Sequence, residues 1–220
     1  MKKLILIIVG CMTSMVSVFG NEVVKVACVG DSITAGVGAK NRKAQNYPAQ
    51  LQALLGDKYT VKNFGVSGIQ TQNYFQSREG ALKKRVVDFQ PDIIVIKLGT
   101  NDTKSRKLED PADKAEFKSK VMGAYLAMVE AFENLESKPE LYVCTPVPVF
   151  KTMGAIREQV LVEDVLPIVQ EVSRKTGAPI IDLYAALTGK GDMVPDGVHP
   201  NEKGYEVIAN AVARVVKDMP

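Results

Sequence analysis

The stretch that decides the fold of this chain spans residues 24–32 and reads VKVACVGDS. Its first six residues are mostly valine and other apolar side chains, and a glycine, an aspartate and a serine follow them directly. A short apolar run of this kind is typical of a strand that is buried on both faces of a parallel sheet. The first element of the fold is therefore expected to be a central strand that ends in a polar turn.

Four more short apolar runs recur along the chain, at 59–64, 93–98, 141–145 and 179–183. Apolar residues at helical spacing lie between and after them, at 44–55, 81–89, 112–135, 156–175 and 202–216. Pro167 is expected to kink or divide the fourth of these helices, and Asn201 to cap the last. The alternation predicts right-handed βαβ units in an α/β fold, a three-layer α/β/α sandwich around a five-stranded parallel sheet.

The length and composition indicate one domain after a targeting segment. The 220 residues are 46% hydrophobic and 24% charged, which is ordinary for a folded protein. Residues 1–20 carry Lys2 and Lys3, then a charge-free apolar run that ends near Gly20, the layout of a cleaved secretory signal. We therefore expect a signal peptide over 1–20, a single domain over 21–220 and an exported protein, periplasmic or secreted. An uncleaved anchor and acylation of Cys11 are the alternatives.

The charge and the cysteine content exclude several classes of partner and cofactor. Without residues 1–20, Lys and Arg fall from 28 to 26 against 25 Asp and Glu, which argues against nucleic acid or an anionic membrane as a stable partner. Cys28 and Cys144 fall in separate apolar runs and are expected to be free core thiols. With one histidine in the chain and no Cys-x-x-Cys, we expect neither a metal nor another cofactor.

Polar residues follow four of the expected strands. They lie at 31–32, 63–68, 99–102 and 196–199, the last just ahead of the final helix. In open parallel sheets ligands bind beyond the carboxyl ends of the strands. These four segments, far apart in sequence, are therefore expected to converge on one site.

Ser32 and His199 form the candidate reactive pair. A serine hydroxyl is a weak nucleophile until a neighbouring base takes its proton, and imidazole is the usual base at neutral pH. His199 is the only histidine of the chain. Asp196 lies three residues before it, so one turn can hold carboxylate and imidazole together, and Asp182 is the rival carboxylate. The alternatives to a catalytic role are that Ser32 only caps a helix and that His199 is only a surface residue.

Four motif blocks in this order resemble those of the SGNH hydrolase superfamily, the GDSL esterases: Gly30-Asp31-Ser32, 65–68, Gly99-Thr100-Asn101-Asp102 and Asp196-x-x-His199. The resemblance implies a flavodoxin-like sandwich, with Ser32 as the nucleophile, His199 as the base and Asp196 as the acid that orients it. It also implies an oxyanion hole made by the backbone N–H groups of Ser32 and Gly68 and the side chain of Asn101. Asp31 and Asp102 are expected to brace loops, and Lys97, an anomalous charge in a strand, to reach the sheet edge without an assigned role.

The segments expected to line the site, 69–80 and 150–158, are polar and carry Gln70, Gln72, Asn73, Tyr74, Gln76, Arg78, Lys151 and Arg157. No long apolar stretch remains for an acyl-chain tunnel. The segments Tyr47-Pro48, 63–68 and 97–102 are similar to the sialate and xylan O-acetylesterase-like branch of the superfamily. These features favour a serine esterase for acetylated carbohydrates, with a small-molecule or glycan ester as substrate. A lysophospholipase or thioesterase, and a glycan-binding protein without activity, are the alternatives.

Overall fold

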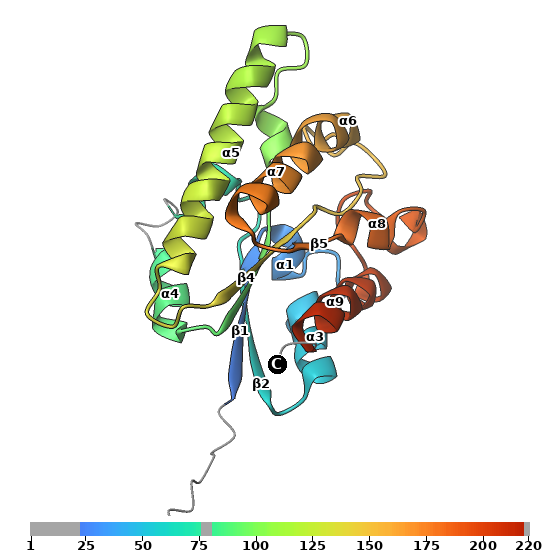
Figure 1. Ribbon diagram of the computed structural model, residues 1–220. Coiled ribbons are helices and arrows are strands. Elements are labelled where there is room, and N and C mark those ends of the chain that lie inside the picture. Colours follow the sequence, from blue (N-terminus) through green and yellow to red (C-terminus); the bar gives the residue numbers. More distant parts are fainter. Residues whose placement is uncertain (1–22, 76–80, 218–220) are drawn as a thin grey trace, which may run out of the picture.

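The five expected strands form one parallel sheet in the computed structural model, which describes residues 23–75 and 81–217. They are β1 (Val24–Gly30), β2 (Tyr59–Gly65), β3 (Ile93–Lys97), β4 (Glu140–Cys144) and β5 (Ile180–Ile181), in the order β2-β1-β3-β4-β5 (Figure 1). After β2 the chain returns across β1 to add β3, so the direction of winding changes between β1 and β3. This position is the topological switch point, where ligands bind in such folds. The prediction of a five-stranded parallel sheet is confirmed.

The register brings the carboxyl ends of the central strands to one level. Gly30 pairs with Gly65 of β2 on one side and with Lys97 of β3 on the other. The segments that leave these three strands therefore begin side by side at one edge of the sheet. This places residues 31–32, 66–68 and 98–101 next to one another, as the sequence pattern predicts.

Helices cover both faces of the sheet. On one face lie α4 (Ala81–Phe89), α5 (Pro111–Glu133) and α7 (Leu166–Thr176), and on the other α3 (Tyr47–Leu55) and α9 (Glu202–Lys217) (Figure 1). Successive side chains of β1 alternate between the two hydrophobic layers, Ala27 and Val29 toward the first and Val26 and Cys28 toward the second. The three-layer sandwich is confirmed.

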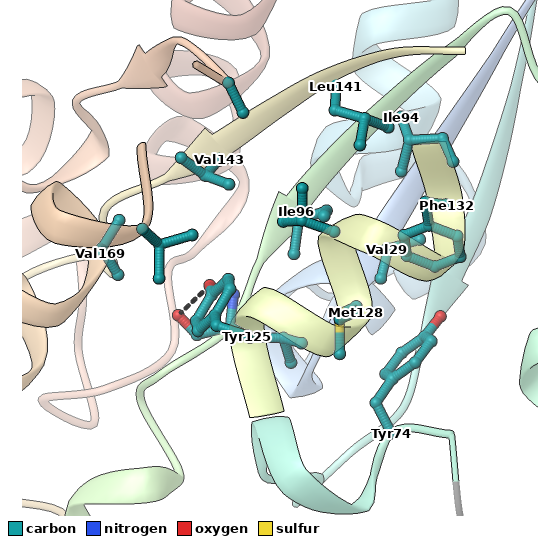
Figure 2. Packing of buried hydrophobic residues seen from close by; sticks show 14 of the residues in the cluster. Val29, Tyr74, Ile94, Ile96, Tyr125, Met128, Phe132, Leu141, Val143 and Val169 are labelled. Carbon is teal, nitrogen blue, oxygen red and sulfur yellow. Dashed lines mark hydrogen bonds between the residues drawn. The ribbon is translucent and has the colours of Figure 1, made fainter. Parts of the chain in front are cut away.

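The long helix α5 supplies most of the first layer. Tyr125, Met128 and Phe132 project from it at three- and four-residue spacing and are almost fully buried. Figure 2 shows them facing sheet side chains that include Ile94 and Ile96. The Tyr125 hydroxyl contacts the backbone of Leu98 at 3.3 Å, so this layer also fixes the segment that follows β3.

Two of the expected helices are interrupted, each for a local chemical reason. Residues 42–55 form α2 (Arg42–Gln45) and α3, because Asn46 leaves the helical conformation and its side chain caps α3 by accepting from the N–H of Ala49 at 2.8 Å. Residues 158–176 form α6 (Glu158–Val160), a π-helical turn (Leu161–Val165) and then α7, with Pro167 in the first turn of α7. The expected division at Pro167 is confirmed, while the unbroken helix over 44–55 is wrong.

Several short helical elements were not predicted from the spacing of apolar residues. They are α1 (Ser32–Ala35), α8 (Leu183–Leu187) and the 3₁₀ turns η1 (Thr71–Asn73), η2 (Asp102–Ser105) and η4 (Gly191–Met193). Each is too short to show a helical repeat. Two of them, α1 and η2, begin at or beside residues of the candidate site.

Cys28 and Cys144 are buried free thiols, and Asn201 caps α9 by accepting from the N–H groups of Lys203 and Gly204 at 3.1 Å, so these predictions are confirmed. The expected signal segment 1–20 lies outside the described residues. Within the described residues, no helix combines the length and apolarity that a membrane crossing needs.

Candidate active site

A tight turn after β1 places Ser32 at the switch point. Asp31 caps α1, since its Oδ1 accepts from the N–H of Ile33 at 2.9 Å, and Ser32 is the first residue of that helix. Gly30 is required by close packing, because a Cβ there would lie 2.1 Å from the Thr34 hydroxyl and 2.6 Å from the Lys97 carbonyl oxygen. As the first helical residue, Ser32 has no intrahelical acceptor for its N–H, which can serve a ligand.

His199 meets Ser32 across 167 residues of sequence. Its Nε2 lies 2.9 Å from Ser32 Oγ, and its Nδ1 lies 2.7 Å from Oδ2 of Asp196. A carboxylate can only accept, so Nδ1 carries the ring proton and Nε2 is left as an acceptor for the serine hydroxyl. The three side chains that the sequence singles out thus form one continuous hydrogen-bonded chain.

Asp196 is held by its own turn. Its Oδ1 accepts from the backbone N–H groups of Val198 at 2.9 Å and His199 at 2.7 Å, while Oδ2 faces the imidazole. Burial by itself raises the pKa of Asp196, but the hydrogen bonds from these two N–H groups and from the His199 ring outweigh it, and the pKa lies below its ordinary value. The carboxylate therefore stays charged opposite the imidazole.

The loop after α1 packs directly on the His199 loop. A Cβ on Gly38, whose φ is +100°, would lie 2.5 Å from the carbonyl oxygen of Pro200 and 3.0 Å from Cβ of His199. The Tyr205 hydroxyl donates to the Val37 carbonyl at 2.6 Å, and Glu202 accepts from the N–H of Lys40 at 2.9 Å. These contacts join the first and last parts of the site.

Asn101 and Gly68 lie at the carboxyl ends of β3 and β2. The Asn101 side chain is buried, and its Nδ2 has no hydrogen-bond partner among the residues that the structure describes. Leaving such a donor unpaired costs about 1–3 kcal/mol, which indicates a site held ready for an acceptor from outside the chain. Gly68 is exposed and has φ +79°, with nothing within 4 Å of a Cβ built on it, so its backbone conformation rather than close packing requires glycine.

Hydrogen bonds join the loop that carries Asn101 to the loop that carries Gly68. Asp102 accepts from the backbone N–H of Thr71 at 3.1 Å and from its hydroxyl at 3.1 Å. Gln70 donates from Nε2 to the Asn101 carbonyl at 3.1 Å. Burial raises the pKa of Asp102 to about 6, although the Thr71 hydrogen bonds act in the opposite direction. The expectation that Asp102 braces a loop is confirmed.

Lys97 does not reach the sheet edge. It is fully buried, and its Nζ lies 2.9 Å from Oδ2 of Asp31 and donates to the Thr100 hydroxyl at 2.9 Å. The expected outward course is wrong because a carboxylate lies within reach inside the protein. This ion pair joins the Ser32 turn to the Asn101 segment.

Asp182 caps a helix, whereas the sequence made it the alternative carboxylate partner of His199. Its Oδ1 accepts from the Thr145 hydroxyl at 2.9 Å and from the N–H of Ala185 at 3.0 Å, and it caps α8. The imidazole Nδ1 faces Asp196 instead. The geometry therefore gives no support to Asp182 as the partner of His199.

The expected rim of the site is revised in part. Tyr74 is fully buried, its hydroxyl donates to the Phe64 carbonyl at 3.0 Å, and it belongs to the core. Gln76 and Arg78 lie outside the described residues. The many charged residues of 104–120 predict a solvated loop and helix start, but Arg106 is buried and pairs with Asp113 at 2.9 Å and Asp164 at 3.3 Å.

Two residues beside the site were not expected to take part in it. Lys104 donates from Nζ to Oδ1 of Asn101 at 2.7 Å, and Thr71 binds Asp102. The three-residue spacing of Lys104 from Asn101 is the one sequence signal for the first contact. Among residues 23–75 and 81–217, no group of three or more His, Cys, Asp or Glu side chains is placed to hold a metal ion.

Comparison with known proteins gives the family. The model of the GDSL-like lipase/acylhydrolase family matches residues 28–207, which contain all four blocks of the site. The chain belongs to this family. An acetylxylan esterase of Xylanibacter ruminicola is 39% identical over 209 residues, covering 89% of this chain and 44% of that protein. The chain thus spans less than half the length of this relative.

Solved structures of the same fold include esterases from two bacteria. An aryl esterase of Mycobacterium smegmatis superposes with a TM-score of 0.68 at 21% identity, covering 90% of this chain and 100% of that one. An acetylxylan esterase of Geobacillus stearothermophilus gives a TM-score of 0.66 at 20% identity, covering 90% and 97%. At these identities the likeness establishes the fold of this GDSL-family member.

Proposed function

We propose that this GDSL-family domain hydrolyses small acyl esters through an acyl-enzyme on Ser32. The observation that carries the proposal is the unbroken chain from Ser32 Oγ to His199 Nε2 at 2.9 Å and from His199 Nδ1 to Asp196 at 2.7 Å. With Nδ1 protonated against the carboxylate, the Nε2 lone pair is directed at the serine hydroxyl. That is the arrangement that activates a serine nucleophile.

The reaction then follows in two halves. Ser32 Oγ attacks the ester carbonyl while His199 Nε2 takes the hydroxyl proton, and Asp196 stabilises the imidazolium that forms. The imidazolium returns this proton to the leaving alcohol oxygen as the C–O bond breaks, which leaves the acyl group on Ser32. A water molecule, deprotonated by His199, attacks the acyl carbonyl, and the proton passes back to Ser32 Oγ as the carboxylic acid leaves.

The negative oxygen of each tetrahedral intermediate needs donors at the same edge of the sheet. The N–H groups of Ser32 and Gly68 and the unpartnered Nδ2 of Asn101 are proposed to supply them. Asn101 is a neutral donor, so it does not oppose protonation of His199 as a neighbouring cation would. Removing one donor of this kind costs about 10²–10³-fold in kcat in well-studied hydrolases.

We propose acetylated carbohydrate, of the xylan type, as the substrate class. The support is the 39% identity to a protein named acetylxylan esterase, together with the partly exposed polar side chain of Gln70, which contacts the Asn101 carbonyl beside the site. A lysophospholipase or thioesterase requires room for a long acyl chain, and a glycan-binding protein without activity requires no reactive serine. The Ser32–His199 contact favours an esterase over a glycan-binding protein without activity.

The test compares acyl chain length and glycan substrates. Hydrolysis of p-nitrophenyl acetate is expected to exceed that of the octanoate and palmitate esters, and acetate is expected to be released from acetylated xylan. Ser32→Ala is expected to abolish both reactions while retaining glycan binding. A preference for palmitate would favour the lipase or thioesterase, and absence of turnover in the wild-type protein would favour the binding protein.

Export is a separate proposal that rests on the sequence of residues 1–20. We propose that this segment directs export and is removed, which leaves a periplasmic or secreted domain that begins near residue 21. N-terminal sequencing of the protein from a bacterial periplasmic fraction tests it. A protein that retains Met1, or one that carries lipid on Cys11, would contradict cleavage near residue 21.

A further inference from the structure

We infer that Lys104 is a positioning residue for the oxyanion donor Asn101, an inference that rests on the proposed esterase function. The contact that carries it joins Lys104 Nζ to Asn101 Oδ1 at 2.7 Å. The opposite end of the same amide, Nδ2, is buried and has no partner among the described residues. One end of the amide is therefore bound within the protein and the other is held free for substrate.

The amide of Asn101 needs such a constraint. Its oxygen and its NH₂ group are of nearly equal size, so rotation by half a turn about the last side-chain bond exchanges them at little steric cost. In the exchanged orientation an acceptor would face the negative oxygen of the intermediate. The site would then lose a donor and gain a repulsion.

An ammonium group resolves this choice, because it has three donors and no acceptor. Lys104 can bind only the oxygen end of the amide, whereas a serine or glutamine in its place could bind either end. Within the residues that the structure describes, Oδ1 of Asn101 has no other hydrogen bond. The orientation of the amide therefore depends on this one contact.

The backbone brings the two side chains together. Both lie in the turn that begins after β3, and the N–H of Lys104 donates to the Asn101 carbonyl at 3.2 Å. The i, i+3 relation of the 3₁₀ turn η2 places both side chains on the same side of it. Asn101 is also fixed through its carbonyl by Gln70, so rotation of the amide is the main freedom that Lys104 removes.

The positive charge has a second effect on the donor. A charge-assisted hydrogen bond to the amide oxygen draws electron density from the amide nitrogen and strengthens its N–H as a donor. The cation acts through the neutral amide instead of contacting the oxyanion. Lys104 is itself exposed, so replacing it opens no cavity in the core.

A double-mutant cycle with Asn101 tests the inference, using hydrolysis of p-nitrophenyl acetate. Lys104→Met is expected to lower kcat on the order of tenfold with KM unchanged. Asn101→Ala alone is expected to lower kcat by about 10²–10³-fold. Adding Lys104→Met to Asn101→Ala is expected to cause no further loss, because Lys104 then has no amide to orient.

Two further measurements separate positioning from a general effect of charge or stability. Lys107→Met removes another exposed lysine of the same segment, which has no hydrogen bond to the Asn101 side chain among the described residues, and is expected to leave kcat unchanged. A boronic acid forms a tetrahedral adduct on Ser32 with an oxygen in the oxyanion hole. Its affinity is expected to fall with Lys104→Met by the same factor as kcat, since both report the oxyanion interaction.

The outcomes are distinct. Equal losses from Lys104→Met in the wild-type and Asn101→Ala backgrounds, or full activity of Lys104→Met, would overturn the role of Lys104. Unchanged turnover after Ser32→Ala would instead overturn the proposed function itself. A loss confined to the wild-type background, with an unchanged Lys107→Met control, supports the inference.

Discussion

Lys97 and Asp31 form an ion pair at 2.9 Å in which neither side chain is exposed to solvent. Asp31 also caps the helix that begins with Ser32, and Lys97 also binds Thr100, the residue before Asn101. The pair therefore connects the nucleophile turn with the segment of the proposed oxyanion donor. Buried charges are costly to desolvate, so each member of this pair depends on the other being in place beneath the site.

Removing one member of the pair leaves the other charged and buried. Lys97→Met is expected to lower the free energy of unfolding by about 3–5 kcal/mol, measured by urea denaturation. Lys84→Met is the matched control, because Lys84 pairs with Asp88 at 2.6 Å but both side chains are largely exposed, and little change is expected. Similar midpoints for the two variants would contradict a structural role for the buried pair.

Replacement by asparagine is expected to affect kcat differently at Asp196 and at Asp182. Asp196→Asn is expected to lower kcat for p-nitrophenyl acetate strongly, up to about 10⁴-fold, because an amide cannot hold His199 in the required tautomer. Its circular dichroism spectrum is expected to match the wild type. Asp182→Asn is expected to leave kcat within a few-fold, since Asp182 caps α8. A reversed order of the two activities would reassign the carboxylate.

Gly38→Ala tests the contact between the loop after α1 and the His199 loop. A Cβ would approach the Pro200 carbonyl oxygen to 2.5 Å, so the His199 loop must shift, and kcat is expected to fall by up to about 10²-fold. Gly177→Ala is the control: Gly177 also has positive φ, +78°, but nothing lies within 4 Å of its built Cβ. That variant is expected to lose some stability and no activity. Equal activities of the two variants would contradict the proposed coupling.

The raised pKa of Asp102 predicts that the stability of the protein depends on pH in a specific way. Its pKa is raised to about 6 in the folded protein by burial, above the ordinary value of 3.8, so the folded state binds the proton more tightly than the unfolded state. The stability that this group contributes is full below about pH 4 and is lost as the pH rises through 6. Asp102→Asn does not titrate, so the wild type is expected to lose stability relative to this variant between pH 4 and 6.5.

Urea denaturation at several pH values measures this difference. Other carboxylates titrate in both proteins and cancel in the comparison. The lowered pKa of Asp196 acts with the opposite sign, since its contribution is lost as the pH falls, but it is present in both chains. A difference between the two proteins that does not vary from pH 4 to 6.5 would show that Asp102 does not titrate in this range.

The arrangement of the site was largely predictable from sequence because of two constraints. A parallel sheet brings the carboxyl ends of its strands to one edge, so the segments that begin at Asp31, Val66 and Leu98 had to lie together. A single histidine left one candidate for the partner of Ser32. The alternating strands and helices sufficed for the layers, and they gave the strand bounds to within a few residues.

The remaining features depend on contacts that periodicity does not encode. Lys97 is an anomalous charge in its strand until Asp31, 66 residues earlier, is placed beside it. Tyr74 lies in a polar segment, yet its ring is buried and its hydroxyl finds the Phe64 carbonyl. The break at Asn46 depends on a side-chain cap that competes with helix continuation. Each of these is decided by tertiary structure or by one hydrogen bond.

The distance in sequence between Ser32 and His199, 167 residues, affects when the site can form. The whole segment from Ser32 to His199 has to be synthesised, and the turn before α9 has to dock, before hydroxyl and imidazole meet. A nascent chain or a refolding intermediate can thus possess a complete nucleophile turn and still be inert toward esters. Covalent labelling of the serine by a fluorophosphonate would therefore time the final docking event of refolding, after the secondary structure has already appeared.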